Sequence, residues 1–164
     1  SASNPAFYKC NRMYGRTTIR RKHHAKVCVT TVNRGNKEEN GRRVCITSDL
    51  GKTWTEHPTS RKALIEPTCM GSIHKHTYHK DGQNKSILLF VNPESYSERN
   101  HITLKISYDD GKTWPENKKI LLDEYNGRGY SCITSVNENT IGILYESSQA
   151  DMVFQQIKLE ELLP

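Results

Sequence analysis

The stretch TSDLGKTW at Thr47–Trp54 recurs sixty residues later as SYDDGKTW at Ser107–Trp114. Both copies follow the pattern S/T-x-D-x-G-x-T-W, which predicts a tight β-hairpin. The Asp side chain can accept hydrogen bonds from N–H groups of its own turn, and Gly takes up a positive φ at low cost. We expect Thr-Trp to begin the return strand and the Trp ring to pack back over the turn. Two matches of this length indicate an internal repeat.

Short apolar runs separated by turn residues extend through the rest of the chain. Several of them alternate, or are rich in Val, Ile, Tyr and Thr, as β-strands are. Their regular spacing predicts an antiparallel all-β fold, in which only Glu160–Leu163 forms a helical turn. A β-sandwich would have the same number of strands, and only the repeated turn favours a β-propeller. The expected strands are Val27–Val32, Arg43–Thr47, Ser72–Tyr78, Ser86–Val91, Ile102–Ser107, Lys119–Leu122, Cys132–Val136, Thr140–Tyr145 and Met152–Leu159.

Charge and cysteine content argue against several classes of protein. The chain has 164 residues and a net charge of +6, but residues 1–43 hold eleven Lys and Arg against two Glu, so the basicity belongs to one end. A solvated end segment explains this better than a nucleic-acid site does. Five cysteines without a C-x-x-C favour neither a disulfide framework nor a zinc knuckle. A zinc set of His74, His76, His79 and Cys69 is a weak alternative, because the spacing fits no standard site.

The two turns resemble the Asp-box repeat of the sialidase (neuraminidase) superfamily, whose fold is a six-bladed β-propeller. In that family the boxes lie at blade turns on the face away from the active site. A blade takes roughly 40–50 residues, so this length supplies about three antiparallel blades. The resemblance therefore implies the C-terminal portion of a larger propeller. We expect residues 1–32 to form a basic segment of no readable pattern and residues 33–164 to form the sialidase-like blades.

Three further stretches resemble sialidase segments and imply site residues. Gly127–Ile133 (GRGYSCI) is similar to the segment that presents the catalytic tyrosine, which makes Tyr130 the nucleophile. Gly142–Glu146 (GILYE) is similar to the family's L-Y-E, in which Glu146 would orient an arginine. Phe90–Pro93 followed by Arg99 is similar to the family's F-x-N-P…R, which makes Arg99 one of three arginines that bind the substrate carboxylate.

The chemistry of the implied substrate explains these residue types. Sialic acid carries a carboxylate on its anomeric carbon, so an Asp or Glu nucleophile would meet like-charge repulsion. A tyrosine is neutral until a base takes its proton, and sialidases are known exceptions to the two-carboxylate rule for glycosidases. An arginine fork matches a carboxylate in bidentate geometry.

Other elements of the family pattern depart from this sequence. Arg16 stands where the family has the glutamate that activates the tyrosine, and Thr31 stands where it has a second arginine unless a gap admits Arg34. The family's first arginine and its general-acid aspartate belong to blades that precede these. The abrupt change near residue 33 suggests a truncated or frame-disturbed product, and we expect poor catalysis from these residues alone.

The sequence thus predicts an exo-α-sialidase portion that acts on sialylated glycans, with no cofactor, no metal, no nucleic-acid partner and no membrane span. A catalytically inactive glycan-binding propeller fragment is the alternative, and a purely structural β-repeat is a third possibility. The parent enzyme would be periplasmic or secreted.

Overall fold

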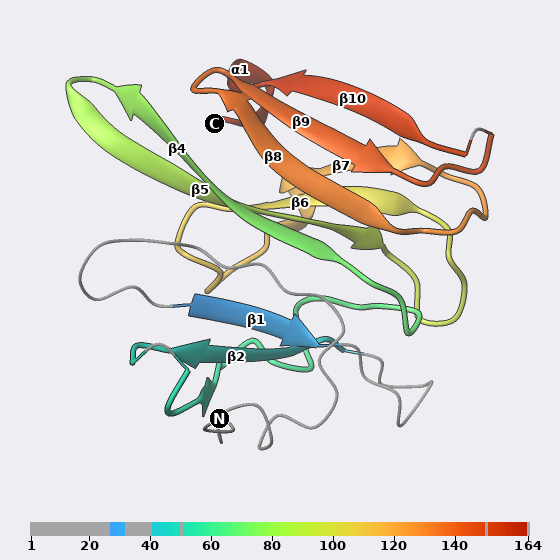
Figure 1. Ribbon diagram of the computed structural model, residues 1–164, viewed down its shortest axis with the longest axis horizontal. Helices are drawn as coiled ribbons and strands as arrows, with labels where there is room; N and C mark the ends of the chain where they lie inside the picture. Colours follow the sequence, from blue (N-terminus) through green and yellow to red (C-terminus); the bar gives the residue numbers. More distant parts are fainter. Residues whose placement is uncertain (1–26, 32–40, 50, 150, 164) are drawn as a thin grey trace, which may run out of the picture.

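Three antiparallel sheets stack face to face in the computed structural model, which describes residues 27–31, 41–49, 51–149 and 151–163 (Figure 1). The sheet orders are β1-β2-β3, β4-β5-β6-β7 and β10-β9-β8, with the four-stranded sheet in the middle. Beside the strands the described residues form one 3-10 turn and one short helix. The strands are β1 (Val27–Thr31), β2 (Arg43–Thr47), β3 (Thr55–Glu56), β4 (Ser72–Lys80), β5 (Gln83–Pro93), β6 (Ile102–Ser107), β7 (Lys119–Asp123), β8 (Ser131–Asn137), β9 (Thr140–Tyr145) and β10 (Val153–Lys158).

The strands predicted from apolar runs are all present, with small differences in length. The two-residue strand β3 was not predicted, because two residues are too few to show a period. The helix α1 (Leu159–Leu162) begins at Leu159, which had been assigned to the last strand. The β4–β5 hairpin turns through Asp81 and Gly82, both at positive φ, which extends the two strands beyond their apolar runs.

Two hydrophobic clusters hold the sheets together, one on each face of the middle sheet. Leu89 and Val91 of β5 contact β8–β10 in the larger cluster, whereas Leu88 and Phe90 face β1–β3 in the smaller one. Successive side chains of a strand point to opposite faces, so a strand covered on both sides buries every residue. All of β6 is buried in this way, and its polar members Thr103, Lys105 and Ser107 are each hydrogen-bonded. Each fully buried Leu or Ile contributes about 1.5–3 kcal/mol relative to exposure.

Both repeated turns are closed by the hydrogen bonds that the pattern predicts. Asp49 accepts from the backbone N–H of Thr53 at 2.9 Å and from its hydroxyl at 2.6 Å, while Thr47 Oγ1 accepts from Gly51 N at 2.9 Å. Gly51 has φ +91°, and Trp54 Nε1 donates to its carbonyl at 3.1 Å. The second copy repeats the first three contacts with Ser107, Asp109, Gly111 and Thr113.

The position of the return strand differs from the prediction in both copies. Thr-Trp precedes the strand and does not open it: β3 begins at Thr55, and β7 begins only at Lys119, after the 3-10 turn Glu116–Lys118. Pro115 is the physical reason in the second copy, because its ring lacks the N–H that a sheet ladder requires. The ring of Trp114 packs edge-on against Phe90, 6.2 Å between centroids, and so joins the turn to the smaller core.

The outer face of the third sheet carries exposed apolar side chains. Leu144 and Phe154 are paired across β9 and β10 and are 37% and 55% exposed, with Val136 at 47%. This sheet therefore buries one face only. The described part of the chain contains no helix with the length and apolarity needed to cross a membrane.

Candidate active site

Three loops bring Arg99, Tyr130 and Glu146 together at one end of the stacked sheets. Arg99 lies between β5 and β6, Tyr130 directly precedes β8, and Glu146 directly follows β9. The Arg99 guanidinium carbon lies 5.5 Å from the centroid of the Tyr130 ring. The backbone N–H of Tyr130 donates to Glu146 Oε2 at 3.2 Å, and Glu146 N donates to the Tyr130 carbonyl at 2.9 Å. The sequence assigned these residues from separate motifs, and the structure makes them neighbours.

The Arg99 side chain is exposed, yet its orientation is fixed. Its Nη1 donates to the carbonyl of Arg128 at 3.0 Å, and its own carbonyl accepts from Gly127 N at 3.0 Å. A third contact between the same two loops joins Asn126 Nδ2 to Glu98 Oε2 at 3.1 Å. A guanidinium carries five N–H donors, so one bond to Arg128 leaves a fork of donors for an anion.

Tyr130 presents an accessible ring at a fixed point of the backbone. The side chain is 45% exposed, while the preceding Gly129 is buried and has φ +83°. A Cβ at Gly129 would lie 2.8 Å from Pro93 Cγ and 3.2 Å from Cys69 Sγ, so only glycine fits here. The hydroxyl of Ser131 anchors the other side by donating to the Val91 carbonyl at 3.1 Å.

The half-buried Glu146 side chain contacts the backbone of the tyrosine. Its carboxylate accepts the Tyr130 N–H, so in the described residues it holds the loop that carries the ring. The orientation of an arginine by Glu146 stays a prediction. Arg16 and Arg34, which bear on the missing family residues, lie outside the described part of the chain, as does the side chain of Thr31.

Buried charges beneath these loops were not predicted from the sequence. Arg42 and Lys105 lie on the Phe90 ring, 5.2 Å and 5.7 Å from its centroid, and both are at most 1% exposed. Lys105 Nζ donates to Asn92 Oδ1 at 2.7 Å and lies 3.6 Å from Glu94. Burial lowers the pKa of Lys105 to about 8, although the Glu94 carboxylate opposes the shift. Asn92 belongs to the F-x-N-P stretch and Lys105 to the strand after it. Lys105 is a polar residue within a predicted apolar strand and Asn92 directly follows one, and this feature of the sequence could have indicated their burial.

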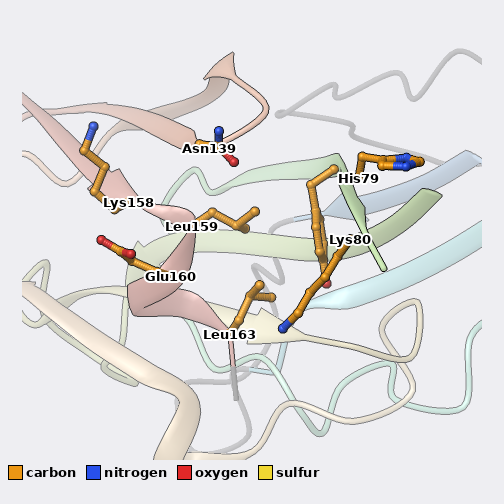
Figure 2. Close-up of a pocket in the computed structure, with 8 residues that line it drawn as sticks. His79, Lys80, Asn139, Lys158, Leu159, Glu160 and Leu163 are labelled. Carbon is orange, nitrogen blue, oxygen red and sulfur yellow. The ribbon is translucent and has the colours of Figure 1, made fainter. Parts of the chain in front are cut away.

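The second repeated turn and a cavity lie at the opposite end of the strands. The 107–114 turn follows the end of β6, whose start lies just after Arg99, so this turn and Arg99 lie at opposite ends of the strand. A cavity of about 550 Å³ opens at that far end, between the β4–β5 hairpin, the β8–β9 turn and α1. In the view of Figure 2, Lys80 and Lys158 lie on opposite sides of Leu159. Arg99, Tyr130 and Glu146 do not line this cavity, whereas His79 of the alternative zinc set does.

The structure does not assemble the alternative zinc set. His74 Nε2 and His76 Nδ1 each lie 2.8 Å from the hydroxyl of Ser135. The Cys69 thiol instead faces the loop that precedes β8 and carries Tyr130, here called the tyrosine loop. Among the described residues, no group of three or more His, Cys, Asp or Glu is placed to hold a metal ion.

Comparison with known proteins identifies the class. A sialidase of Bacteroides fragilis (strain YCH46) is 46% identical over 135 residues, which are 82% of this chain and 25% of that protein. A sialidase of Micromonospora viridifaciens is 31% identical over 107 residues, or 64% of this chain and 16% of that one. The solved Hadza microbial sialidase Hz136 superposes with a TM-score of 0.75 at 41% identity, covering 84% of this chain and 26% of that structure. No protein-family model matches the chain.

These relatives and the three stacked antiparallel sheets define a portion of a sialidase β-propeller. The chain belongs to the bacterial sialidase superfamily. It spans about a quarter of the length of the Bacteroides fragilis relative, with 25% of that protein covered. Its fold class is confirmed, whereas the division between residues 32 and 33 stays a prediction.

Proposed function

We propose that the protein represented by this chain is an exo-α-sialidase that releases terminal sialic acid from glycans. Relatives that carry the name sialidase support this reaction class. The observation that carries the proposal is the meeting of Arg99 with Tyr130, 5.5 Å from guanidinium carbon to ring centroid, on a loop fixed by Glu146. A cationic fork beside an exposed phenol suits a substrate whose carboxylate adjoins its reacting carbon.

The residues take distinct parts in the proposed reaction. The free donors of Arg99 bind the sialic acid carboxylate, which places the anomeric carbon near the ring of Tyr130. The phenol oxygen loses its proton to a base and bonds to that carbon as the bond to the glycan oxygen breaks. The glycan oxygen takes up a proton, and water then releases the sugar from the tyrosine. Two displacements at one carbon retain the configuration.

The proton-transfer groups are not among the residues of this chain that match the family. Glu146 accepts the Tyr130 backbone N–H, and we expect the base for the phenol to come from outside the described residues. We therefore expect weak turnover from these residues alone and full activity only in the longer protein.

Turnover of a fluorogenic α-sialoside tests the proposal. The chain, and a longer protein that contains it, are compared with Tyr130→Phe. The matched control is Tyr125→Phe, since Tyr125 is an exposed tyrosine (62%) of the preceding loop. We expect Tyr130→Phe to abolish turnover and Tyr125→Phe to retain it. Mass spectrometry of the quenched reaction should find the sugar on the peptide that contains Tyr130.

Two outcomes would count against the proposal. Equal activity in wild type and Tyr130→Phe would exclude the tyrosine as nucleophile. Retention of sialylated glycans without release of sugar, in the longer protein as well, would favour a catalytically inactive glycan-binding propeller.

A further inference from the structure

A buried ion pair lies below the tyrosine loop. Arg42 immediately precedes β2, and Glu66 lies in the connection between β3 and β4. Their side chains are 1% and 0% exposed, with Arg42 Nη2 3.5 Å from Glu66 Oε2. Removing two charges from water is costly, and a buried pair is weak evidence for stability alone. The role of the Arg42–Glu66 pair therefore depends on the backbone that it holds in place.

Both charges act on the backbone of one residue, Cys69. Arg42 Nη2 donates to the Cys69 carbonyl at 2.6 Å, and Cys69 N donates to Glu66 Oε2 at 3.0 Å. The donor and the acceptor of this residue are thus bound by opposite charges of the same pair. Charge-assisted hydrogen bonds of this kind are shorter and stronger than neutral ones. The position of Cys69 is fixed from both sides.

The Cys69 side chain contacts the tyrosine loop, so the fixed position of Cys69 constrains that loop. Its thiol lies 3.6 Å from the carbonyl oxygen of Gly129 and 3.9 Å from that of Arg128, within reach of a weak S–H donor. It is 1% exposed, and burial raises the pKa of the thiol, which keeps it protonated as a donor. Gly129 adjoins Tyr130, so displacement of the thiol displaces the peptide before the ring.

We propose that Arg42, Glu66 and Cys69 are positioning residues for Tyr130, acting through the contact of the Cys69 thiol with Gly129. The role in catalysis rests on the proposed function, whereas the mechanical connection does not. The carbonyl of Arg128 also accepts from Arg99 Nη1, so the same thiol supports the loop on which the substrate arginine rests. The connection joins the residue before β2 to the loop before β8 across the edge of the middle sheet.

Fluorine NMR tests the connection without any substrate. The chain carries eight tyrosines, and uniform 3-fluorotyrosine labelling gives each a resonance. The Tyr130 and Tyr145 resonances are those lost in the respective Phe variants. We expect Cys69→Ala to shift or broaden the Tyr130 resonance and to leave that of Tyr145, which lies in the larger core, unchanged. Cys45→Ala, which removes another buried thiol, on β2, should move neither resonance.

A Tyr130 resonance that is the same in wild type and folded Cys69→Ala would overturn the proposal. So would equal displacement of Tyr130 and Tyr145, because a general loss of packing moves both. Glu66→Gln should displace Tyr130 in the same direction as Cys69→Ala, and an opposite or absent shift in the folded variant contradicts the part assigned to the ion pair. If Glu66→Gln does not fold, Cys69→Ala decides. The NMR result does not depend on sialidase activity. An inactive protein would therefore contradict the proposed function without contradicting the mechanical connection between Cys69 and Tyr130.

Discussion

Replacement of Gly129 by alanine should cost far more stability than the same replacement at Gly82. Both glycines have positive φ, +83° and +72°, so both variants carry the strain of an L-residue in that region, about 1–2 kcal/mol. At Gly82 an added Cβ meets no atom within 4 Å, whereas at Gly129 it would lie 2.8 Å from Pro93 Cγ. Overpacking of this kind adds about 1–3 kcal/mol.

The two variants therefore form a matched pair that isolates the steric contribution. The change in the unfolded chain is the same Gly→Ala in both, and it cancels in the comparison. We expect a loss of about 1 kcal/mol for Gly82→Ala and about 3 kcal/mol for Gly129→Ala from the two contributions above. With a urea slope of about 2 kcal/mol per molar, the two midpoints should differ by about 1 M.

Urea unfolding followed by tryptophan fluorescence measures the difference, since Trp114 packs in the smaller core. Coinciding midpoints for the two variants would refute the reasoning, because the close contact at Gly129 would then be relieved without cost. If the protein relieves the close contact by moving Pro93 or Cys69 away from the new methyl group, the Tyr130 ring should be displaced from Arg99.

Three further expectations concern the core, the repeated turn and the outer face of the third sheet. Leu89→Ala, at a fully buried core position, should destabilise by about 2–5 kcal/mol in urea unfolding, against about 0.5 kcal/mol or less for exposed Leu121→Ala. Burial raises the pKa of Asp109, but hydrogen bonds from Thr113 and Ser107 outweigh it and lower the pKa to about 2. The stabilisation is therefore present above the unfolded pKa, near 4, and is lost as pH falls toward 2, so the stability gap between wild type and Asp109→Asn should narrow from pH 5 to pH 2. A constant gap would contradict this assignment. Phe154→Lys should reduce self-association in analytical ultracentrifugation, because it places a charge in the exposed apolar face, and unchanged sedimentation would show that this face takes no part.

The strands and turns were predictable because their causes are local. The alternating or continuous apolar pattern of a strand can be recognised without knowing where in the chain its partner strands lie. The Asp49 and Asp109 turns are closed by contacts that span four residues. The two-residue strand β3 escaped prediction, because pairing with β2, not local pattern, sets its limits. The start of β7 at Lys119 was predicted from its apolar run, whereas the expectation that Thr-Trp opens the return strand was wrong.

The candidate site was predictable only in part. Arg99, Tyr130 and Glu146 were assigned by resemblance, and composition alone would have left each of them on the surface. Arg42, Glu66 and Lys105 show the converse, since charged residues are expected in solvent and these are buried. Their partners lie far away in the sequence: 27 residues separate Arg42 from Cys69, and 60 separate Cys69 from Gly129. A single sequence carries no sign of such pairs.

The arrangement of the sheets explains why the site could not be contained in one motif. Arg99 comes from a loop of the middle sheet, whereas Tyr130 and Glu146 flank strands of the third. Arg42 reaches the same loops from the first sheet, through Cys69. The distance between Arg99 and Tyr130 is thus set by how the middle sheet packs on the third, and that packing is set by the side chains of the larger core. The chemistry proposed for the exposed loops depends on apolar residues that never meet a substrate, so core substitutions such as Leu89→Ala should disturb the Tyr130 environment even where the fold survives.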